Sequence, residues 1–338
     1  MKYLKWPLII LAGLILIYVL LCLVGPKNMN TSRSIKISAS SAQIFNLFDD
    51  LKMWESWSPW AAADTTMNIT FGDKTVGEGA SYEWKGDASG SGDLKITESL
   101  QNDQAKIKMN FHDYGSSSMV DFKIADGGKE KELTWNMVDE EDLPFLARGM
   151  MLVTGMKGTL KKQFDQGLAS LKRIAEERAS GAYLGHKVKL VNVNEKHFVI
   201  NRQEISMSTV ASFLGGNHVS LISELSKMGE EMVGRPAGLF YKWNEGESTT
   251  DIAAAIPIAE AISFKNLSTT SLPAGNAIQV DYYGESSKSS SAHYAIDAFM
   301  KDHGIVNNVP ILEEYITDPS TEPDPKKWLT QIIYYIAE

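Results

Sequence analysis

The stretch Pro310–Ile336, PILEEYITDPSTEPDPKKWLTQIIYYI, indicates how this chain folds. Residues 311–317 alternate apolar and polar side chains, which predicts a half-buried strand. Three acidic residues, each followed by proline, predict a loop over 318–326. The apolar run Trp328–Ile336 then predicts a second strand.

The first of these two strands carries the candidate site. With a period of two, Glu313 and Tyr315 share one face of the strand and Glu314 points the other way. A carboxylate beside a phenol on an otherwise apolar face predicts a ligand pocket. A strand whose face is open to solvent would carry the same residues, so both interpretations stay open.

An earlier stretch, Pro236–Ile258, PAGLFYKWNEGESTTDIAAAIPI, has the same layout at an offset of 75 residues. Gly238 falls where Glu313 falls, and Phe240 falls where Tyr315 falls. A helical pattern preceded by a strand pattern comes before each copy; the helices are expected at 217–228 and 287–303, and the strands at 197–204 and 276–282. Two strand-helix-strand-strand copies are therefore predicted to pack as one pseudo-symmetric unit, with a groove between them.

Length, charge and cysteine content exclude several classes of protein. The chain has 338 residues, which predicts two domains, and a net charge of −9. Proteins that bind nucleic acid present clustered basic surface, so no nucleic-acid partner is expected. The single cysteine, Cys22, excludes an internal disulfide and a cysteine-based zinc site. Without a phosphate loop, nucleophile elbow or metalloprotease motif, we expect no metal and no cofactor. Protein partners stay unknown.

The N-terminal segment 1–26 is predicted to be an uncleaved transmembrane anchor. Leu8–Val24 is a run of 17 residues without a charge, close to the ~20 that a bilayer core needs. Lys2 and Lys5 precede it, which favours a cytoplasmic N-terminus and soluble domains on the extracytoplasmic side. A cleaved signal peptide is the competing interpretation, but no Ala-x-Ala cleavage site follows the run.

Residues 27–180 are predicted to form the first soluble domain, an α+β arrangement. After a strand at 33–38, Ser40 and Gln43 form a capping-box pattern that opens a helix. Six strands and a long helix over 156–178 follow, the strands being expected at 67–71, 80–85, 91–100, 104–112, 116–125 and 130–138. The order predicts an antiparallel sheet curling around the last helix and enclosing an apolar cavity.

This domain resembles the SRPBCC superfamily (START-like, polyketide cyclase/dehydrase-like) over about 34–176. The motifs that carry the resemblance are ISASSAQIF from Ile37, WESWSPW from Trp54, GEGASYEW from Gly77 and FDQGLASL from Phe164. The resemblance implies a helix-grip fold with a hydrophobic cavity and assigns no reaction. We expect Trp54, Trp57 and Trp60 at the base or mouth of that cavity, with Trp84 on a neighbouring strand. These tryptophans would equally serve to seal the core.

The second domain, 187–338, resembles the GyrI-like effector-binding domain that also occurs in AraC- and MerR-type regulators. Besides the doubled unit, the resemblance depends on GRPAGLF from Gly234, LPAG from Leu272, EEYITDP from Glu313 and WLTQI from Trp328. In that family the glutamate of Glu-x-Tyr sits in the ligand cleft, which implies that role for Glu313, with Tyr315 beside it. Gln331 stands where a second glutamate is usual, so one carboxylate of the pair remains in the predicted pocket.

Three functions follow as alternatives. The favoured one is a membrane-anchored protein that binds a small apolar or cationic ligand, anchored in the bilayer through residues 8–24. Its second cavity would have Glu313 as polar anchor and Phe240, Tyr241 or Trp243 as aromatic walls. The second is a hydrolase of small electrophilic molecules, in which Glu313 is the general base and Tyr315 its partner. The third is a structural or interaction module of an envelope complex.

Overall fold

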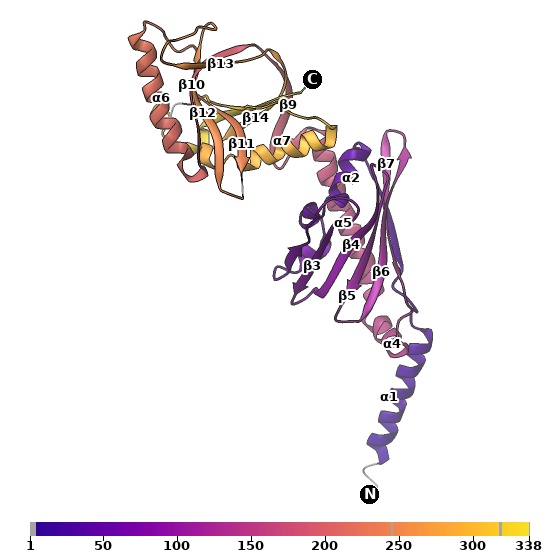
Figure 1. Ribbon diagram of the computed structural model, residues 1–338. Helices are drawn as coiled ribbons and strands as arrows, with labels where there is room; N and C mark the ends of the chain where they lie inside the picture. Colours follow the sequence, from indigo (N-terminus) through magenta and orange to yellow (C-terminus); the bar gives the residue numbers. More distant parts are fainter. Residues whose placement is uncertain (1–4, 245, 318–319, 338) are drawn as a thin grey trace. The chain divides into compact units, whose positions relative to one another are not determined.

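A computed structural model of the chain describes residues 5–244, 246–317 and 320–337 (Figure 1). The chain forms two compact units, Met1–Ser180 and Gly181–Glu338. Each unit contains one antiparallel sheet, of seven strands in the first and nine in the second. The predicted α+β class, with two antiparallel sheets and an N-terminal apolar helix, is confirmed. Lys2, and Asp318-Pro319 of the predicted loop, lie outside the described residues.

The N-terminal helix α1, Lys5–Val24, is long and apolar. Within the described residues it is the one helix with the length and composition to cross a membrane, and its window Trp6–Val24 has a mean hydropathy of 3.0. A membrane anchor and a signal sequence both fit this helix. Its apolar side chains are exposed along most of its length.

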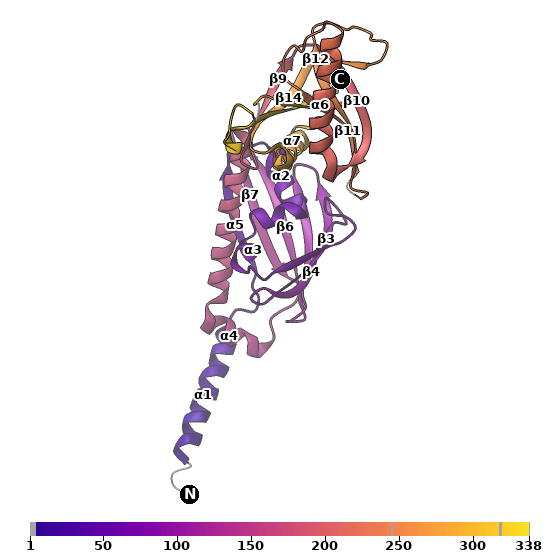
Figure 2. The ribbon, with the colours of Figure 1, turned by 90° about the vertical axis from the view of Figure 1, so that its left-hand side faces the viewer.

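The first unit is a sheet covered on one face by helices (Figure 2). The strand order is β1-β7-β6-β5-β4-β3-β2, and every pairing in it is antiparallel. The strands are β1 Thr31–Ile37, β2 Asn68–Phe71, β3 Ser81–Gly86, β4 Gly90–Leu100, β5 Gln104–Phe111, β6 Ser116–Gly127 and β7 Glu130–Asp139. The helices are α2 Ser41–Asp49, α3 Pro59–Ala63, α4 Phe145–Thr154 and α5 Met156–Ala179, with a 3-10 turn at Leu51–Ser56.

Local sequence explains two of these helices. Ser40 accepts from the backbone of Gln43 and the Gln43 side chain bonds back to Ser40, which is the capping box predicted for α2. In α5, the residues of the predicted apolar stripe Phe164, Leu168 and Leu171 are buried in the core between helix and sheet. Helix α4 was not predicted, because its N-cap residue Pro144 offers no capping side chain and only Gly155 separates the helix from α5.

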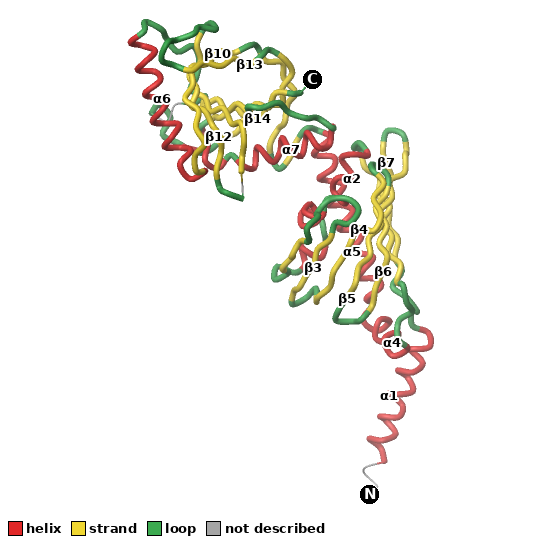
Figure 3. The backbone as a smooth tube through the Cα atoms, in the orientation of Figure 1, coloured by secondary structure: helices red, strands yellow, loops and turns green. Residues whose placement is uncertain are grey.

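The second unit is built on a nine-stranded sheet with the order β13-β10-β12-β11-β15-β16-β14-β9-β8. Figure 3 shows the strands of this unit in yellow, with helices α6 and α7 in red. Its strands are β8 Ala182–Tyr183, β9 His186–Val193, β10 Lys196–Ser206, β11 Ala237–Asn244, β12 Thr249–Ile258, β13 Ser268–Leu272, β14 Gly275–Tyr283, β15 Ile311–Tyr315 and β16 Leu329–Tyr335. Its helices are α6 Val210–Lys227 and α7 Ser290–His303, with 3-10 turns at Met207–Thr209, Ser286–Lys288 and Pro325–Lys327.

The strand-helix-strand-strand order occurs twice in this unit, as β10-α6-β11-β12 and β14-α7-β15-β16. The copies meet where β11 pairs with β15, and Gly238 lies directly opposite Glu313 in that pairing. Positions that the 75-residue offset makes equivalent are therefore neighbours across the centre of the sheet. Both helices pack against one face of the sheet, while a second apolar cluster covers the other face.

One predicted boundary is wrong. The first helix was predicted over 217–228, but α6 begins at Val210 and continues through Gly215 and Gly216. Glycine costs only about 0.5–1 kcal/mol relative to alanine inside a helix. The packing of Leu214, Leu221 and Leu225 against the sheet outweighs that cost.

Candidate functional site

A cavity of about 600 Å³ lies in the second unit, on the sheet face that α6 and α7 cover. This volume is in the range of small-molecule sites. Its walls come from both repeats: α6 and β11 from the first, and α7, β15 and β16 from the second. The lining residues are Met207, Ser208, Val210, Ala211, Leu214, Phe240, Trp243, Thr250, Ser286, Ser287, Ser289, Ser290, His293, Tyr294, Asp297, Glu313, Tyr315 and Tyr334.

Glu313 lines this cavity and is almost completely buried, with 4% of its surface exposed. Its neighbour Glu314 faces the opposite side of the sheet, where Lys196 donates to it at 2.5 Å. Both carboxylate oxygens of Glu313 have partners: the Tyr315 hydroxyl donates to Oε2 at 3.1 Å, and Nε2 of His293 lies 2.8 Å from Oε1. The interpretation of this strand face as solvated surface is therefore wrong. A buried carboxylate is tolerated here because these hydrogen bonds compensate its lost hydration.

His293 connects Glu313 to the far wall of the cavity. Its Nδ1 lies 3.0 Å from the Tyr334 hydroxyl. When Glu313 is ionised, His293 donates its Nε2–H to the carboxylate. Nδ1 of the neutral ring then accepts a hydrogen bond from the Tyr334 hydroxyl. The result is a chain of hydrogen bonds Tyr334–His293–Glu313–Tyr315 that fixes all four side chains.

The surroundings shift the pKa values of three side chains that line the cavity, Tyr315, Tyr334 and Asp297. Burial raises the pKa of Tyr315 well above its usual range, and the charge of Glu313 adds to the effect. Burial likewise raises the pKa of Tyr334, with smaller effects from Asp297 and Glu313. Both phenols therefore remain protonated donors at neutral pH. Partial desolvation at the cavity edge raises the pKa of the Asp297 carboxyl, an effect that nearby His293 opposes.

A β-bulge in β11 decides which aromatic residues line the cavity. The pairing of β11 with β12 shifts between Phe240 and Lys242, which places Phe240 and Trp243 on the same face. Their rings stack with centroids 4.8 Å apart and planes 5° from parallel, forming one wall. Tyr241 instead packs on the other face, where the Arg202 guanidinium lies 3.5 Å from its ring centroid. Two of the three predicted aromatic walls thus line the cavity, and the placement of Tyr241 there is corrected.

Gln331 also lies away from the cavity. It pairs with Glu314, not Glu313, across β15 and β16. Its side-chain amide donates to Asp281 at 3.1 Å, in a polar group that includes Lys189. Gln331 is therefore no substitute for a second cavity carboxylate. Strand parity explains the error, because residues 330, 332 and 334 face the cavity side of β16 and 331 does not.

Gly238 gives Tyr315 the space it occupies. A Cβ at this position would lie 2.9 Å from the Tyr315 hydroxyl and 3.1 Å from the Phe240 ring. The position equivalent to Glu313 in the first repeat thus has no side chain, which leaves space for the phenol that binds Glu313.

The tryptophans of the first unit lie in its core. Trp54 and Trp57 are buried, and their indole N–H groups donate to the Phe48 and Leu47 carbonyls at 2.8 and 2.7 Å. Trp60 is half-buried against Trp135, 5.5 Å between centroids. Trp84 is buried over Gly92, where a Cβ would lie 2.3 Å from its ring. These contacts fit the core-sealing interpretation, and a ligand-binding role for the four tryptophans stays a prediction.

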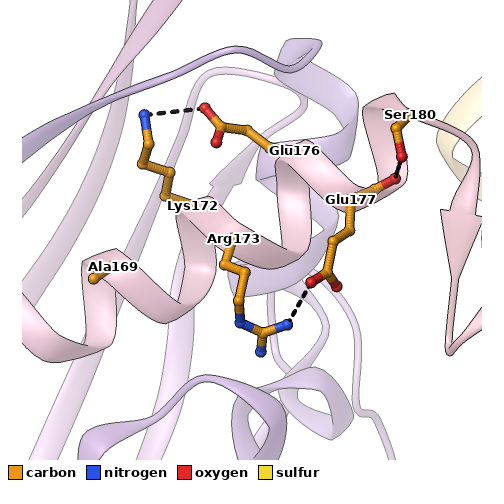
Figure 4. Close-up of a pocket in the computed structure, with 6 residues that line it drawn as sticks. All are labelled: Ala169, Lys172, Arg173, Glu176, Glu177 and Ser180. Atoms are coloured by element: carbon orange, nitrogen blue, oxygen red, sulfur yellow. Dashed lines mark hydrogen bonds and ion pairs between the residues drawn. The ribbon is translucent and has the colours of Figure 1, made fainter.

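A second hollow, of about 420 Å³, runs along α5 in the first unit (Figure 4). Its charged residues pair with one another one helical turn apart, Lys172 with Glu176 at 3.0 Å and Arg173 with Glu177 at 2.8 Å. Such pairs stabilise an exposed helix surface. The hollow offers no buried polar group, so the candidate site is the cavity around Glu313.

Several cavity residues were not predicted, above all His293, Asp297 and Tyr334. Ser290, His293, Tyr294 and Asp297 follow the i, i+3, i+4, i+7 spacing of one helix face, which was the available signal. No cluster of three or more His, Cys, Asp or Glu side chains able to hold a metal occurs among the described residues. The cavity therefore combines one compensated carboxylate with stacked aromatic walls, an arrangement suited to holding an organic molecule with a positive end.

Comparisons with solved structures give matches at low sequence identity. A cryo-EM structure of an EcmrR–DNA complex matches with a TM-score of 0.42 and 15% identity, over 57% of this chain and 72% of that chain. The crystal structure of the EcmrR C-terminal domain matches with a TM-score of 0.39 and 15% identity, over 45% and 98%. Protein CV1439 from Chromobacterium violaceum matches with a TM-score of 0.34 and 15% identity, over 44% and 96%. No protein-family model and no curated protein matches the chain.

Proposed function

We propose that this chain is a membrane-anchored binding protein for a small aromatic or amphipathic cation. The observation that carries the proposal is the buried carboxylate of Glu313 in a cavity walled by the stacked rings of Phe240 and Trp243. Apart from His293, the ionisable groups that line the cavity are acids or phenols. A bound cation gains charge attraction from Glu313 and Asp297 and cation–π contact with the rings.

The test is a comparison of Glu313→Gln with Glu314→Gln. Both substitutions remove one carboxylate from β15, but Glu314 faces the other side of the sheet and serves as the matched control. The ligands are 1-methylquinolinium and its neutral isostere 1-methylnaphthalene, with affinities measured by calorimetry. We expect Glu313→Gln to weaken the cation about tenfold or more, roughly 1.4 kcal/mol, and to leave the neutral compound unchanged.

Equal cation affinity in wild type and Glu313→Gln would show that the assignment of the site is wrong. The same two proteins also test the hydrolase alternative. If wild type turns over electrophilic esters or epoxides and Glu313→Gln does not, Glu313 is a general base and the protein is an enzyme.

We propose further that α1 is retained as the anchor, with a cytoplasmic N-terminus and the two units on the extracytoplasmic side. Contacts between α1 and α4 support retention over cleavage. The Tyr18 hydroxyl donates to the Leu146 carbonyl at 2.8 Å, and a Cβ on Gly149 would lie 2.7 Å from the Cys22 sulfur. Intact mass of the membrane-purified protein tests this, because a mature chain that begins after residue 22 would exclude an anchor.

A further inference from the structure

Helix α4 in the first unit exposes an apolar stripe that its own unit does not cover. Leu146, Met150 and Val153, at i, i+4 and i+7, are all exposed. Phe145 and Leu152 widen the stripe, and Met156 continues it past the helix. A contiguous exposed stripe of large apolar side chains marks an interaction surface.

The stripe carries no charge. The one ionisable residue of α4 is Arg148, and the chain itself holds its guanidinium. Its Nε donates to the Leu143 carbonyl at 2.9 Å, and it lies 3.6 Å from the Asp142 carboxylate. The exposed side of α4 therefore presents hydrocarbon and a thioether, and its one hydroxyl, on Thr154 at the end of the helix, donates to the Met150 carbonyl at 2.9 Å, so the surface has the chemistry of a lipid-facing one.

The position of α4 along α1 fixes its depth. Gly149 of α4 packs against Tyr18 and Cys22, and Gly25 lies against the backbone of Arg148. Tyr18 and Cys22 belong to the last two turns of α1 and Gly25 follows its last residue, and both views show α4 beside that end of the helix (Figures 1 and 2). At 1.5 Å per residue, Trp6–Val24 spans roughly 28 Å, nearly the whole hydrocarbon thickness. The end of α1 therefore coincides with the boundary between acyl chains and headgroups.

We infer that α4 is a membrane-surface helix whose stripe is immersed in the leaflet at the C-terminal end of α1. The other side of α4 faces the core of the first unit, where Met151 packs. Apolar side chains of an interfacial helix enter the headgroup–acyl boundary by about 5–10 Å. Two adjacent helices, α1 and α4, then attach the first unit to the bilayer, instead of α1 alone. This inference rests on the proposed anchoring by α1.

The test uses the full chain with Cys22→Ser and one new cysteine, at Leu146 or Val153, labelled with bimane. Leu100→Cys is the matched control, because Leu100 is also an exposed leucine but lies by the β4–β5 turn, at the opposite end of the sheet from Asp139 and α4. The proteins are reconstituted in phosphatidylcholine vesicles, with or without lipids that carry a nitroxide on the acyl chain. We expect the α4 labels to lose most of their quenching by aqueous iodide and to be quenched by the nitroxide lipid, and the Leu100 label to show the reverse.

Other outcomes overturn the inference in distinguishable ways. If alkaline carbonate leaves the chain in the vesicles but iodide still quenches the α4 labels, the anchor holds and α4 is not inserted. If both quenchers fail at α4, protein covers the stripe, and a second copy or another protein replaces lipid as the occupant. If carbonate extracts the chain, the anchoring proposal itself fails, and the inference fails with it.

Discussion

At the scale of single residues, the candidate site depends on Gly238, because the Tyr315 hydroxyl occupies the space that a side chain at position 238 would need. Gly238 and Glu313 are paired across β11 and β15, and the Tyr315 hydroxyl lies over Gly238 while it donates to Glu313. The position of the phenol, and hence one hydrogen bond to the buried carboxylate, is set by the absence of a side chain on the neighbouring strand.

Gly238→Ala should therefore destabilise the second unit by about 1–3 kcal/mol, the usual cost of overpacking, and weaken cation binding by displacing Tyr315. Gly216→Ala is the control, because Gly216 lies in α6 and a Cβ added there would meet no atom within 4 Å. Gly216→Ala should raise the free energy of unfolding of the second unit by about 0.5–1 kcal/mol. Denaturant unfolding and calorimetry measure both effects.

The double variant Gly238→Ala with Tyr315→Phe tests whether contact with the Tyr315 hydroxyl causes the loss of stability in Gly238→Ala. Removing the hydroxyl relieves the contact at 2.9 Å, so the double variant should be more stable than the sum of the two single substitutions predicts, although the hydrogen bond to Glu313 stays lost and the contact of 3.1 Å with the Phe240 ring remains. If Gly238→Ala is as stable as wild type, the space over Gly238 does not constrain Tyr315.

At the scale of elements, a single carboxylate fastens the end of α3 to the β3–β4 turn in the first unit. One oxygen of Asp64 accepts from the backbone and hydroxyl of Thr66, and the other accepts from Ala88 and Ser89. Hydrogen bonds from Thr66 and Ser89 hold the pKa of Asp64 far below its usual range.

Because the folded state depresses this pKa, Asp64 stabilises the fold above the unfolded pKa of about 4, and that contribution is lost as the pH falls through the folded value. Asp64→Asn should lower the melting temperature at pH 7. Its melting temperature should then fall less than that of wild type between about pH 4 and pH 2. Asp87→Asn, an exposed position in the same turn, is the control, and thermal unfolding followed by circular dichroism gives both profiles. Parallel profiles for wild type and Asp64→Asn would contradict the role of Asp64.

Elements also show what the sequence could and could not predict. The succession of strands in the first unit, the two strand-helix-strand-strand copies of the second, the capping box of α2 and the stripe of α5 follow from periodicity and capping residues, which act locally. Strands β8, β9 and β13, which flank the two copies in the sheet, were not predicted. The face of Trp243 could not be predicted, because the bulge after Phe240 depends on the partner strand and turns Trp243 toward the cavity, whereas Tyr241 lies on the other face, as a period of two from Phe240 requires. His293 was missed for a related reason: the sequence shows a helix face, but only the packing of α7 on the sheet brings it to Glu313.

At the scale of the whole molecule, every residue that lines the cavity belongs to the second unit, between Met207 and Tyr334. Residues 181–338 expressed alone should fold and bind 1-methylquinolinium with the affinity of the full chain in detergent. Isothermal titration of both proteins provides the comparison. A weaker or absent signal from a fragment that is folded by circular dichroism would mean that the first unit or the membrane segment contributes to binding.

The pairing of Gly238 with Glu313 also sets a stoichiometry. A duplicated fold with two identical halves would offer two equivalent binding sites, or one site that binds a ligand in either of two orientations. Here both carboxylates that line the cavity, Glu313 and Asp297, belong to the second repeat, and the position equivalent to Glu313 in the first repeat is Gly238, over which the Tyr315 phenol lies. We therefore expect each chain to bind one ligand in a single orientation. A ligand with a positive charge at both ends should bind with the same affinity as one with a single charge.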